Sequence, residues 1–552
     1  GGIYDLTEYS LTSMDLRATV SYNADLGKTG DHILNLFAGS ELNSTDRQAI
    51  WFRGWGYQYD NGGIPYVDYR LFKQSQEEGT DYYSNTFQYL RNLAFFGMAT
   101  YSYKGRYTIN GTLRYEGSNM LGKSRQARWL PTWNVSGSWN AHEENWWQPA
   151  FGKAWTYASL KASYSLTADR GPASNSLAVF QSFTPWRPST SANESAIILA
   201  ALENSELTYE KKNELNIGVA LGFVDNRINV EFDWYRRNNF DLIGYTQTMG
   251  VGGVTTKLAN DATMESTGCE FTISTTNIKT KDFKWTTDWI FGWAENTITK
   301  LDSRSQVYSL VNGVGRTEGR PIGALYSIPF AGLTEEGLPT FFIDAEHTQV
   351  VGPGNYADIY FQEYENIDYL KYEGTIDPKI TGSFGNTFSW KGLKLNVFFT
   401  YSFGNVLRLD NLCPVYSSDY SDLTASMKEM KNRWMVPGDE TVTTIPSIPT
   451  VRQMREIDAL NNAYSAYNYS TERVAKGDFI RLKELSLAYD LPKKYFEGQN
   501  AVSSFGVKLS ATNLWLAYAD KKLNGRDPEY YNTGGVSSPV PRQFTLTVKL
   551  GF

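Results

Sequence analysis

Apolar and polar residues alternate along many stretches of this chain. Residues 543–552 show the pattern most clearly, with apolar side chains at Phe544, Leu546, Val548, Leu550 and Phe552. A period of two puts successive side chains on opposite faces of a β-strand. The same alternation at 106–116, 213–224, 227–242 and 504–513 predicts further strands, each with one apolar face.

The apolar faces of these strands are rich in aromatic residues, while the opposite faces mix charged residues with Gly and Ser. A soluble β-sandwich would bury a mainly aliphatic face. Apolar-out, polar-in strands with aromatic girdles are typical of a membrane barrel. We therefore expect an all-β fold, a transmembrane antiparallel β-barrel with long extracellular loops.

The alternating runs predict about fifteen strands. Short turns near 103–105, 224–226 and 390–392 join some of them, whereas the connections at roughly 46–91, 167–212, 301–378, 405–478 and 517–541 are long and predicted to be irregular extracellular loops. Residues 422–434 are the best helix candidate. The predicted strands lie near 14–24, 32–44, 92–103, 106–116, 129–140, 155–166, 213–224, 227–242, 264–276, 284–299, 379–390, 393–403, 478–489, 504–513 and 543–552.

Composition narrows the possible partners and functions. The formal net charge of -7 and the lack of a basic block make nucleic acid an improbable partner. Only two cysteines are present, Cys269 and Cys413, which excludes a disulfide scaffold. The longest apolar run, 196–202, is too short for a membrane helix, and the first residues carry no signal-peptide pattern.

A search for catalytic and metal-binding motifs returns little. His32, His142 and His347 lack metal-ligand spacing, and no P-loop, dinucleotide fingerprint or nucleophile elbow occurs. We expect neither an enzyme nor a cofactor or metal site. The 59 acidic residues could still supply a glycosidase-like pair. The main alternative is therefore a soluble carbohydrate-active β-protein that binds glycans or hydrolyses glycosides, and a barrel with a purely structural role is a further one.

Two loop segments are candidates for ligand contact. The first is aromatic and could stack on sugar rings or clamp a peptide, or else pack on its own rings; its candidate residues are Trp51, Trp55, Tyr57, Tyr59, Tyr66 and Tyr69. The second, 335–377, carries ten acids and one lysine. It could bind a cation, but a solvated acidic loop is the preferred interpretation.

A set of short motifs occurs in one order along most of the chain. They lie at 96–107, 114–118, 207–211, 216–218, 318–323, 377–384, 479–492, 512–514, 527–529 and 539–544. With these motifs the chain resembles the SusC/RagA-type TonB-dependent transporters of Bacteroidetes outer membranes over roughly residues 90–552. Residues 364–369 lack the calcium-loop spacing of many members, so no metal site is carried over.

The resemblance implies TonB-dependent import of large nutrients across the outer membrane, with oligosaccharides the first choice of substrate and oligopeptides a close second. It also implies a SusD-like surface lipoprotein as partner, TonB contact through a region absent here, and a dimer of transporter–lipoprotein pairs. Family barrels have about 22 strands. Residues 1–552 are therefore expected to be the C-terminal portion of a single barrel domain, without a plug domain. Four further tyrosines join the predicted loop contacts: Tyr416, Tyr420, Tyr530 and Tyr531.

Overall fold

A computed structural model describes residues 2–27, 30–63, 68–78, 80–173, 176–183, 196–251, 253–412, 428–492, 495, 503–531 and 541–551. Backbone hydrogen bonds join fifteen of its strands into one sheet, in the order β1-β2-β3-β4-β5-β6-β9-β10-β11-β12-β18-β19-β22-β23-β24. Neighbouring strands are antiparallel from β1 to β5 and from β18 to β24 along this order, as between β1 and β2 or β23 and β24. Contacts divide the chain into two compact units. The first comprises 1–140, 161–215 and 237–263, and the second comprises the remainder.

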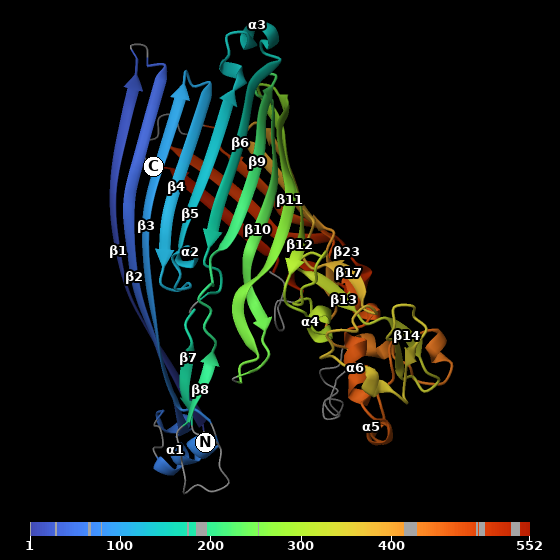
Figure 1. Ribbon diagram of the computed structural model, residues 1–552. Helices are drawn as coiled ribbons and strands as arrows, with labels where there is room; N and C mark the ends of the chain where they lie inside the picture. Colours follow the sequence, from blue (N-terminus) through green and yellow to red (C-terminus); the bar gives the residue numbers. More distant parts are fainter. Residues whose placement is uncertain are drawn as a thin grey trace. The chain divides into compact units, whose positions relative to one another are not determined.

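All fifteen predicted strands are present, so the predicted sheet is confirmed. Their observed bounds are β1 Gly2–Leu26, β2 His32–Tyr57, β3 Tyr83–Tyr103, β4 Tyr107–Ser118, β5 Trp129–Asn140, β6 Trp155–Asp169, β9 Glu210–Phe223, β10 Ile228–Gln247, β11 Thr256–Lys279, β12 Phe283–Leu301, β18 Ile380–Trp390, β19 Leu393–Phe403, β22 Phe479–Asp490, β23 Ser504–Ala519 and β24 Gln543–Gly551. Strands β1 to β5 of the first unit lie side by side (Figure 1).

Several strands extend beyond the predicted bounds. The prediction of an irregular loop at 46–91 is wrong at both ends, because β2 continues to Tyr57 and β3 begins at Tyr83. The pairing of β1 with β2 runs without a break from Ile3 opposite Trp55 to Leu26 opposite His32. Backbone hydrogen bonds continue the β1–β2 hairpin beyond the residues whose apolar and polar side chains alternate. Alternation alone therefore predicts strands that are too short.

The two faces of the sheet differ as the alternation predicted. In the second unit, Leu546 lies opposite Leu509, and Leu509 lies opposite Leu487. These three side chains are 66%, 52% and 45% exposed. The adjacent row on the other face carries Thr545, Ser510 and Ser486. An exposed apolar row backed by a polar row matches strands whose apolar side faces lipid.

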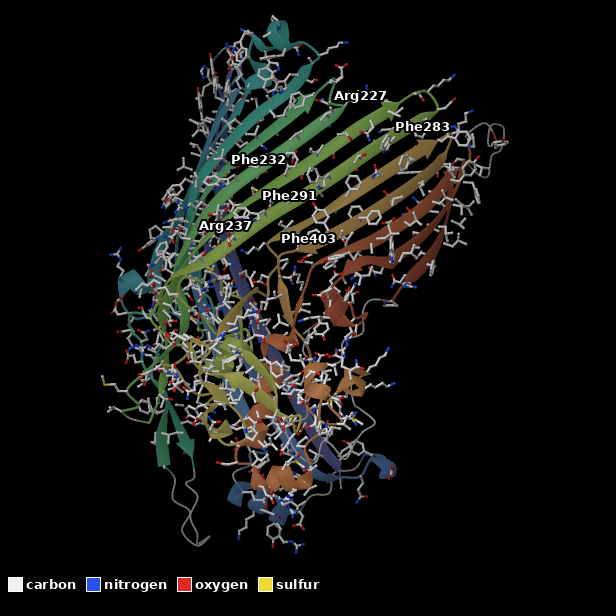
Figure 2. All side chains as sticks on the ribbon, turned by 90° about the vertical axis from the view of Figure 1, so that its right-hand side faces the viewer. Arg227, Phe232, Arg237, Phe283, Phe291 and Phe403 are labelled. Atoms are coloured by element: carbon white, nitrogen blue, oxygen red, sulfur yellow. The ribbon has the colours of Figure 1, made fainter. Side chains whose placement is uncertain are left out.

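Short turns join strands at one end of the second unit. Arg227 and Phe283 each follow such a turn, and they lie at the same end of the strands in Figure 2. Val224, Asp225 and Asn226 have φ of 54°, 54° and 59° in the turn between β9 and β10. Positive φ at successive turn residues matches the right-handed twist of the paired strands.

The segments expected to be irregular at 301–378 and 405–478 are instead folded over residues 301–378, 405–412 and 428–478, which corrects that prediction for these described residues. They share a core in which Leu338, Phe341, Tyr356 and Tyr467 are almost fully buried. We call this part of the second unit the loop domain. Its elements are α4 Val307–Val311, β13 Ala324–Ser327, β14 Phe330–Leu333, β15 Pro339–Phe342, β16 Val350–Val351, η3 Tyr356–Asp358, β17 Lys371–Thr375, β20 Val406–Arg408, η6 Lys428–Asn432, η7 Asp439–Thr441, α5 Val451–Glu456, α6 Leu460–Asn468, η8 Thr471–Arg473 and β21 Val474–Lys476.

The helix predicted at 422–434 is wrong where it can be checked. Residues 422–427 lie outside the described residues, and Lys428–Asn432 form a single 3-10 turn. The α-helices lie later, at α5 and α6. Thr450 and Gln453 form a capping box at the start of α5, a sequence signal that would have found it.

The remaining elements are short. They are η1 Tyr59–Asn61, α1 Tyr69–Glu77, α2 Arg125–Arg128, η2 Ala141–Glu143, α3 Trp147–Phe151, the paired strands β7 Val179–Phe183 and β8 Ala196–Ala201, η10 Lys521–Leu523 and η11 Pro528–Tyr530. None of the helices in the described part of the chain has the length and apolar character needed to cross a bilayer.

Candidate functional site

An aromatic cluster lies where β2 ends and β3 begins in the first unit. The Trp55 ring meets the ring of Phe72 from α1 edge-on, with centroids 5.8 Å apart. Phe72 also contacts Tyr82, at 5.0 Å between centroids. Edge-to-face contacts of this kind stabilise aromatic clusters beyond simple burial. Trp55 therefore holds α1 against the strand ends, and much of its ring is already occupied.

Tyr57 is likewise engaged by neighbouring rings. It stacks on Tyr4 of β1 with centroids 5.0 Å apart and planes inclined by 15°, and it meets Tyr59 at 4.7 Å. The Tyr59 hydroxyl donates a hydrogen bond to the backbone carbonyl of Ile3, 2.7 Å away. These contacts hold β1 and β2 together at the end of the hairpin that is opposite its turn.

Two of the predicted contact residues present open rings. Tyr69, the first residue of α1, is 77% exposed, and Tyr59 is 65% exposed despite its hydrogen bond. Trp51 differs from both, because the guanidinium of Arg53 lies over its ring at 5.2 Å. Arg53 in turn holds Asp5 through two hydrogen bonds of 2.7 and 2.8 Å. The open surface suited to stacking on a ligand is thus Tyr59 and Tyr69.

The other predicted tyrosines are either outside the described residues or in the second unit. Tyr66, Tyr416 and Tyr420 lie outside the described residues. Tyr530 ends η11 and is partly buried, and burial raises the pKa of its hydroxyl. The Tyr531 hydroxyl accepts a hydrogen bond from Arg526 at 3.1 Å. Both belong to the second unit, whereas the aromatic cluster belongs to the first.

A buried arginine clamp holds the segment that carries these two tyrosines. Arg481 of β22 is 4% exposed and donates to the carboxylate of Asp527 at 2.5 Å. Its Nε lies 3.2 Å from the carboxylate of Glu529. The sequence identified 527–529 only as a family motif and did not pair it with Arg481. The clamp explains the motif, because two carboxylates attach this segment to the sheet.

A charged cluster on the polar face of the first unit was also not predicted. Phe96 lies between two guanidinium groups, Arg17 at 5.0 Å and Arg114 at 5.9 Å from the ring centroid. Arg114 pairs with Glu116 at 2.5 Å and Glu41 at 3.5 Å. These residues come from four strands, and only the register of those strands brings them together. The polar face therefore offers paired charges around an aromatic ring.

The acidic segment 335–377 belongs largely to the loop domain and is not simply a solvated loop. Its backbone supplies many of the partners for its carboxylates. Backbone N–H groups, first that of Thr348, hold the pKa of Asp344 below its ordinary value. The N–H groups of Glu365 and Tyr364 lower the pKa of Glu363 in the same way. Within the described ranges, no three His, Cys, Asp or Glu side chains are grouped as metal ligands would be.

Arg408 holds several segments of the loop domain through its guanidinium. Burial lowers the pKa of its guanidinium to about 10. It donates to the backbone carbonyls of Ser470 at 2.9 Å and Val311 at 3.2 Å, and also to that of Tyr326. Three carbonyls from separate segments converge on one side chain, so Arg408 ties the loop domain together.

Comparisons with known proteins agree with the β-barrel fold. No protein-family model matches the chain. It is 26% identical over 487 residues to the TonB-dependent receptor P3 of Formosa agariphila, covering 83% of this chain and 45% of the receptor. It is 27% identical over 214 residues to the TonB-dependent receptor SusC of Bacteroides thetaiotaomicron, covering 38% of this chain and 21% of that receptor.

Among solved structures, the RagAB peptide transporter superposes with a TM-score of 0.75 and 21% identity, covering 100% of this chain and 56% of that one. The predicted resemblance, the barrel fold class and the outer-membrane location are confirmed. The chain spans about half the length of the curated relatives it matches most extensively.

Proposed function

Since this chain is similar to SusC/RagA-type TonB-dependent transporters along most of its length, we propose that it forms barrel wall and outer loops of a nutrient importer. The observation that carries the proposal is the two-faced sheet. One face exposes rows such as Leu546, Leu509 and Leu487, and the other carries hydroxyls and paired charges. Such a sheet separates lipid from a polar interior through which a hydrophilic nutrient can pass.

The proposed import is TonB-dependent and serves solutes too large for porins. Relatives carry the word receptor in their names, and none is named as an enzyme. The soluble carbohydrate-active alternative is disfavoured, because a soluble protein rarely exposes so large an apolar surface. We propose no catalytic activity for this chain.

For the substrate we propose oligosaccharides first and oligopeptides second. Tyr59 and Tyr69 offer open aromatic faces, and such faces suit the apolar side of a sugar ring. The structure of a peptide transporter has the same fold, which keeps peptides as the second candidate. Tyr66, Tyr416, Tyr420, Tyr530 and Tyr531 remain predicted contacts.

The proposed partners follow from the same relatives. We propose a SusD-like surface lipoprotein over the outer loops, TonB contact through a part of the protein outside this chain, and a dimer of transporter–lipoprotein pairs. The loop domain supports an outer partner, because it is a folded surface with a core of its own. We also propose that 1–552 belongs to one barrel domain of a longer protein, since the similarity covers about half of each longer relative.

Isothermal titration calorimetry on the complex of the full-length protein and its lipoprotein partner tests this function. Oligosaccharides and oligopeptides of matched length are titrated separately, and uptake of the ligand that binds is then measured in cells with and without TonB. We expect one class to bind and its uptake to require TonB. Binding of neither class, or uptake that persists without TonB, would contradict the proposal.

A further inference from the structure

The lipid-facing side of the first unit contains a groove of 650 Å³ across strands β1 to β5. Its floor consists of small residues in two adjacent rows. Ala38 lies opposite Gly97 in one row, and Ala99 lies opposite Gly111 in the next. The small side chains shift by one row from β2 to β4, so the groove runs obliquely across the strands.

Larger apolar side chains border this floor. In the first row, Val20 of β1 lies opposite Ala38, and Leu113 of β4 lies opposite Gly97. In the second row Leu36 and Val135 lie on either side of the small pair. Val20, Leu113 and Val135 are each more than half exposed. The groove therefore has apolar walls and an apolar floor.

The two glycines of the floor are not explained by the chain itself. Neither Gly97 nor Gly111 has a positive φ, so their backbone suits any residue. A Cβ atom at Gly111 would meet nothing within 4 Å, and one at Gly97 would meet only the Phe37 carbonyl oxygen, at 3.8 Å. Glycine inside a strand reduces stability and often marks a place where a ligand approaches closely. The space above these two glycines is not filled by the chain and is available to another molecule.

Two features place that space beside a lipid chain. Tyr103, Tyr107 and Trp139 form one row across the strands nearest the short turn at 104–106. Aromatic rows of this kind mark the edge of the hydrocarbon layer. Ala99 lies four residues from Tyr103, roughly 13 Å along the strand. The groove thus begins inside the hydrocarbon layer, on the side of the short turns.

A cationic side chain stands at the turn itself. The Lys104 ammonium lies 5.4 Å from the Tyr103 ring centroid and pairs with the Asp31 carboxylate at 3.7 Å, and the Lys104 side chain is still 38% exposed. An ammonium group beside the aromatic row can attract a lipid phosphate, while the acyl chain enters the groove. We propose that this groove binds one acyl chain of a phospholipid from the inner leaflet, with the lipid phosphate near Lys104. The site is separate from the proposed import function.

The experiment compares lipid retention by full-length protein purified from outer membranes. Phospholipid per protein is counted by native mass spectrometry after detergent exchange. Ala99→Leu places a branched side chain in the groove, and Ala18→Leu makes the same change at an exposed position of β1 that does not line the groove. Barrel folding is checked by the heat-dependent shift in gel mobility.

We expect the wild-type protein and Ala18→Leu to retain one phospholipid. Ala99→Leu and Gly111→Leu should lower its retention by roughly tenfold or more, since two or three methylene contacts are lost. Gly111→Ala, the smallest filling, should give an intermediate value. Equal retention by all folded variants, no retained lipid in the wild type, or a co-purifying protein lost in place of lipid would overturn the proposal.

Discussion

The orientation of the sheet can be tested at Leu546 in the last strand. It is the fourth of nine residues in β24, it is 66% exposed, and it lies opposite Leu509. Leu546→Arg would place a guanidinium on the face that we assign to lipid, close to the middle of the strand. Thr545→Arg is the matched control, because its neighbour across the ladder is Ser510 on the polar face.

The size of the effect follows from position. An arginine on the lipid face of a barrel costs about 2–4 kcal/mol near the bilayer midplane and about 0–1 kcal/mol near the interfaces. With Leu546 near mid-strand we expect the larger cost, equivalent to roughly 30- to 1000-fold in the folding equilibrium. At Thr545 the guanidinium can stay in water, so the cost should lie within about 0.5 kcal/mol.

Folding of the full-length protein into lipid vesicles over a urea series provides the measurement, with tryptophan fluorescence as the signal. The Leu546→Arg transition should shift to clearly lower urea, and the Thr545→Arg transition should stay close to that of the wild type. Equal shifts in the two variants would refute the assignment of faces. A larger shift for Thr545→Arg would reverse it.

Three further outcomes are expected. Arg481→Met leaves a buried carboxylate unpaired and should cost about 3–5 kcal/mol locally, seen as faster proteolysis of 520–531 in an otherwise folded protein; unchanged cleavage would argue against the clamp. Tyr69→Ala should weaken ligand binding several-fold without altering stability, whereas Trp55→Ala should loosen α1, and calorimetry with thermal melting separates the two; equal effects would contradict their different surroundings. The pKa of Asp344 lies below its ordinary value of 3.8, so its contribution is present above that value and is lost as the pH falls through the lower, folded-state pKa. Hydrogen exchange in the turn at 344–349 should therefore show less protection at pH 2.5 than at pH 5, and equal protection would count against the carboxylate's role.

The residues around Phe96 show why part of the candidate site escaped sequence reasoning. Arg17, Glu41 and Arg114 are far apart in the chain, and each alone reads as a polar position of a strand. They meet because β1, β2, β3 and β4 pair in one register. A strand pattern gives the face of a residue but not its neighbours across the ladder.

The aromatic segment illustrates the same limit. Sequence identified Trp55 and Tyr57 as candidates because of their ring type, and the structure shows both rings engaged by Phe72, Tyr4 and Tyr59. Tyr69 is open because it begins α1, whose place is fixed by packing. Ring exposure is a tertiary property, so the sequence proposes the candidates and the fold selects among them.

The sequence by itself determined the number and approximate place of the fifteen sheet strands. A strand with lipid on one side and polar groups on the other needs apolar and polar residues in alternation along its whole length. Each strand can therefore be recognised from its own short stretch of sequence. Only the tertiary structure decided how far the strands extend and that two long connections form one domain. Tyr356 and Tyr467 of its core lie more than a hundred residues apart in the chain, and no local pattern encodes that they share one core. Their burial depends on both segments at once.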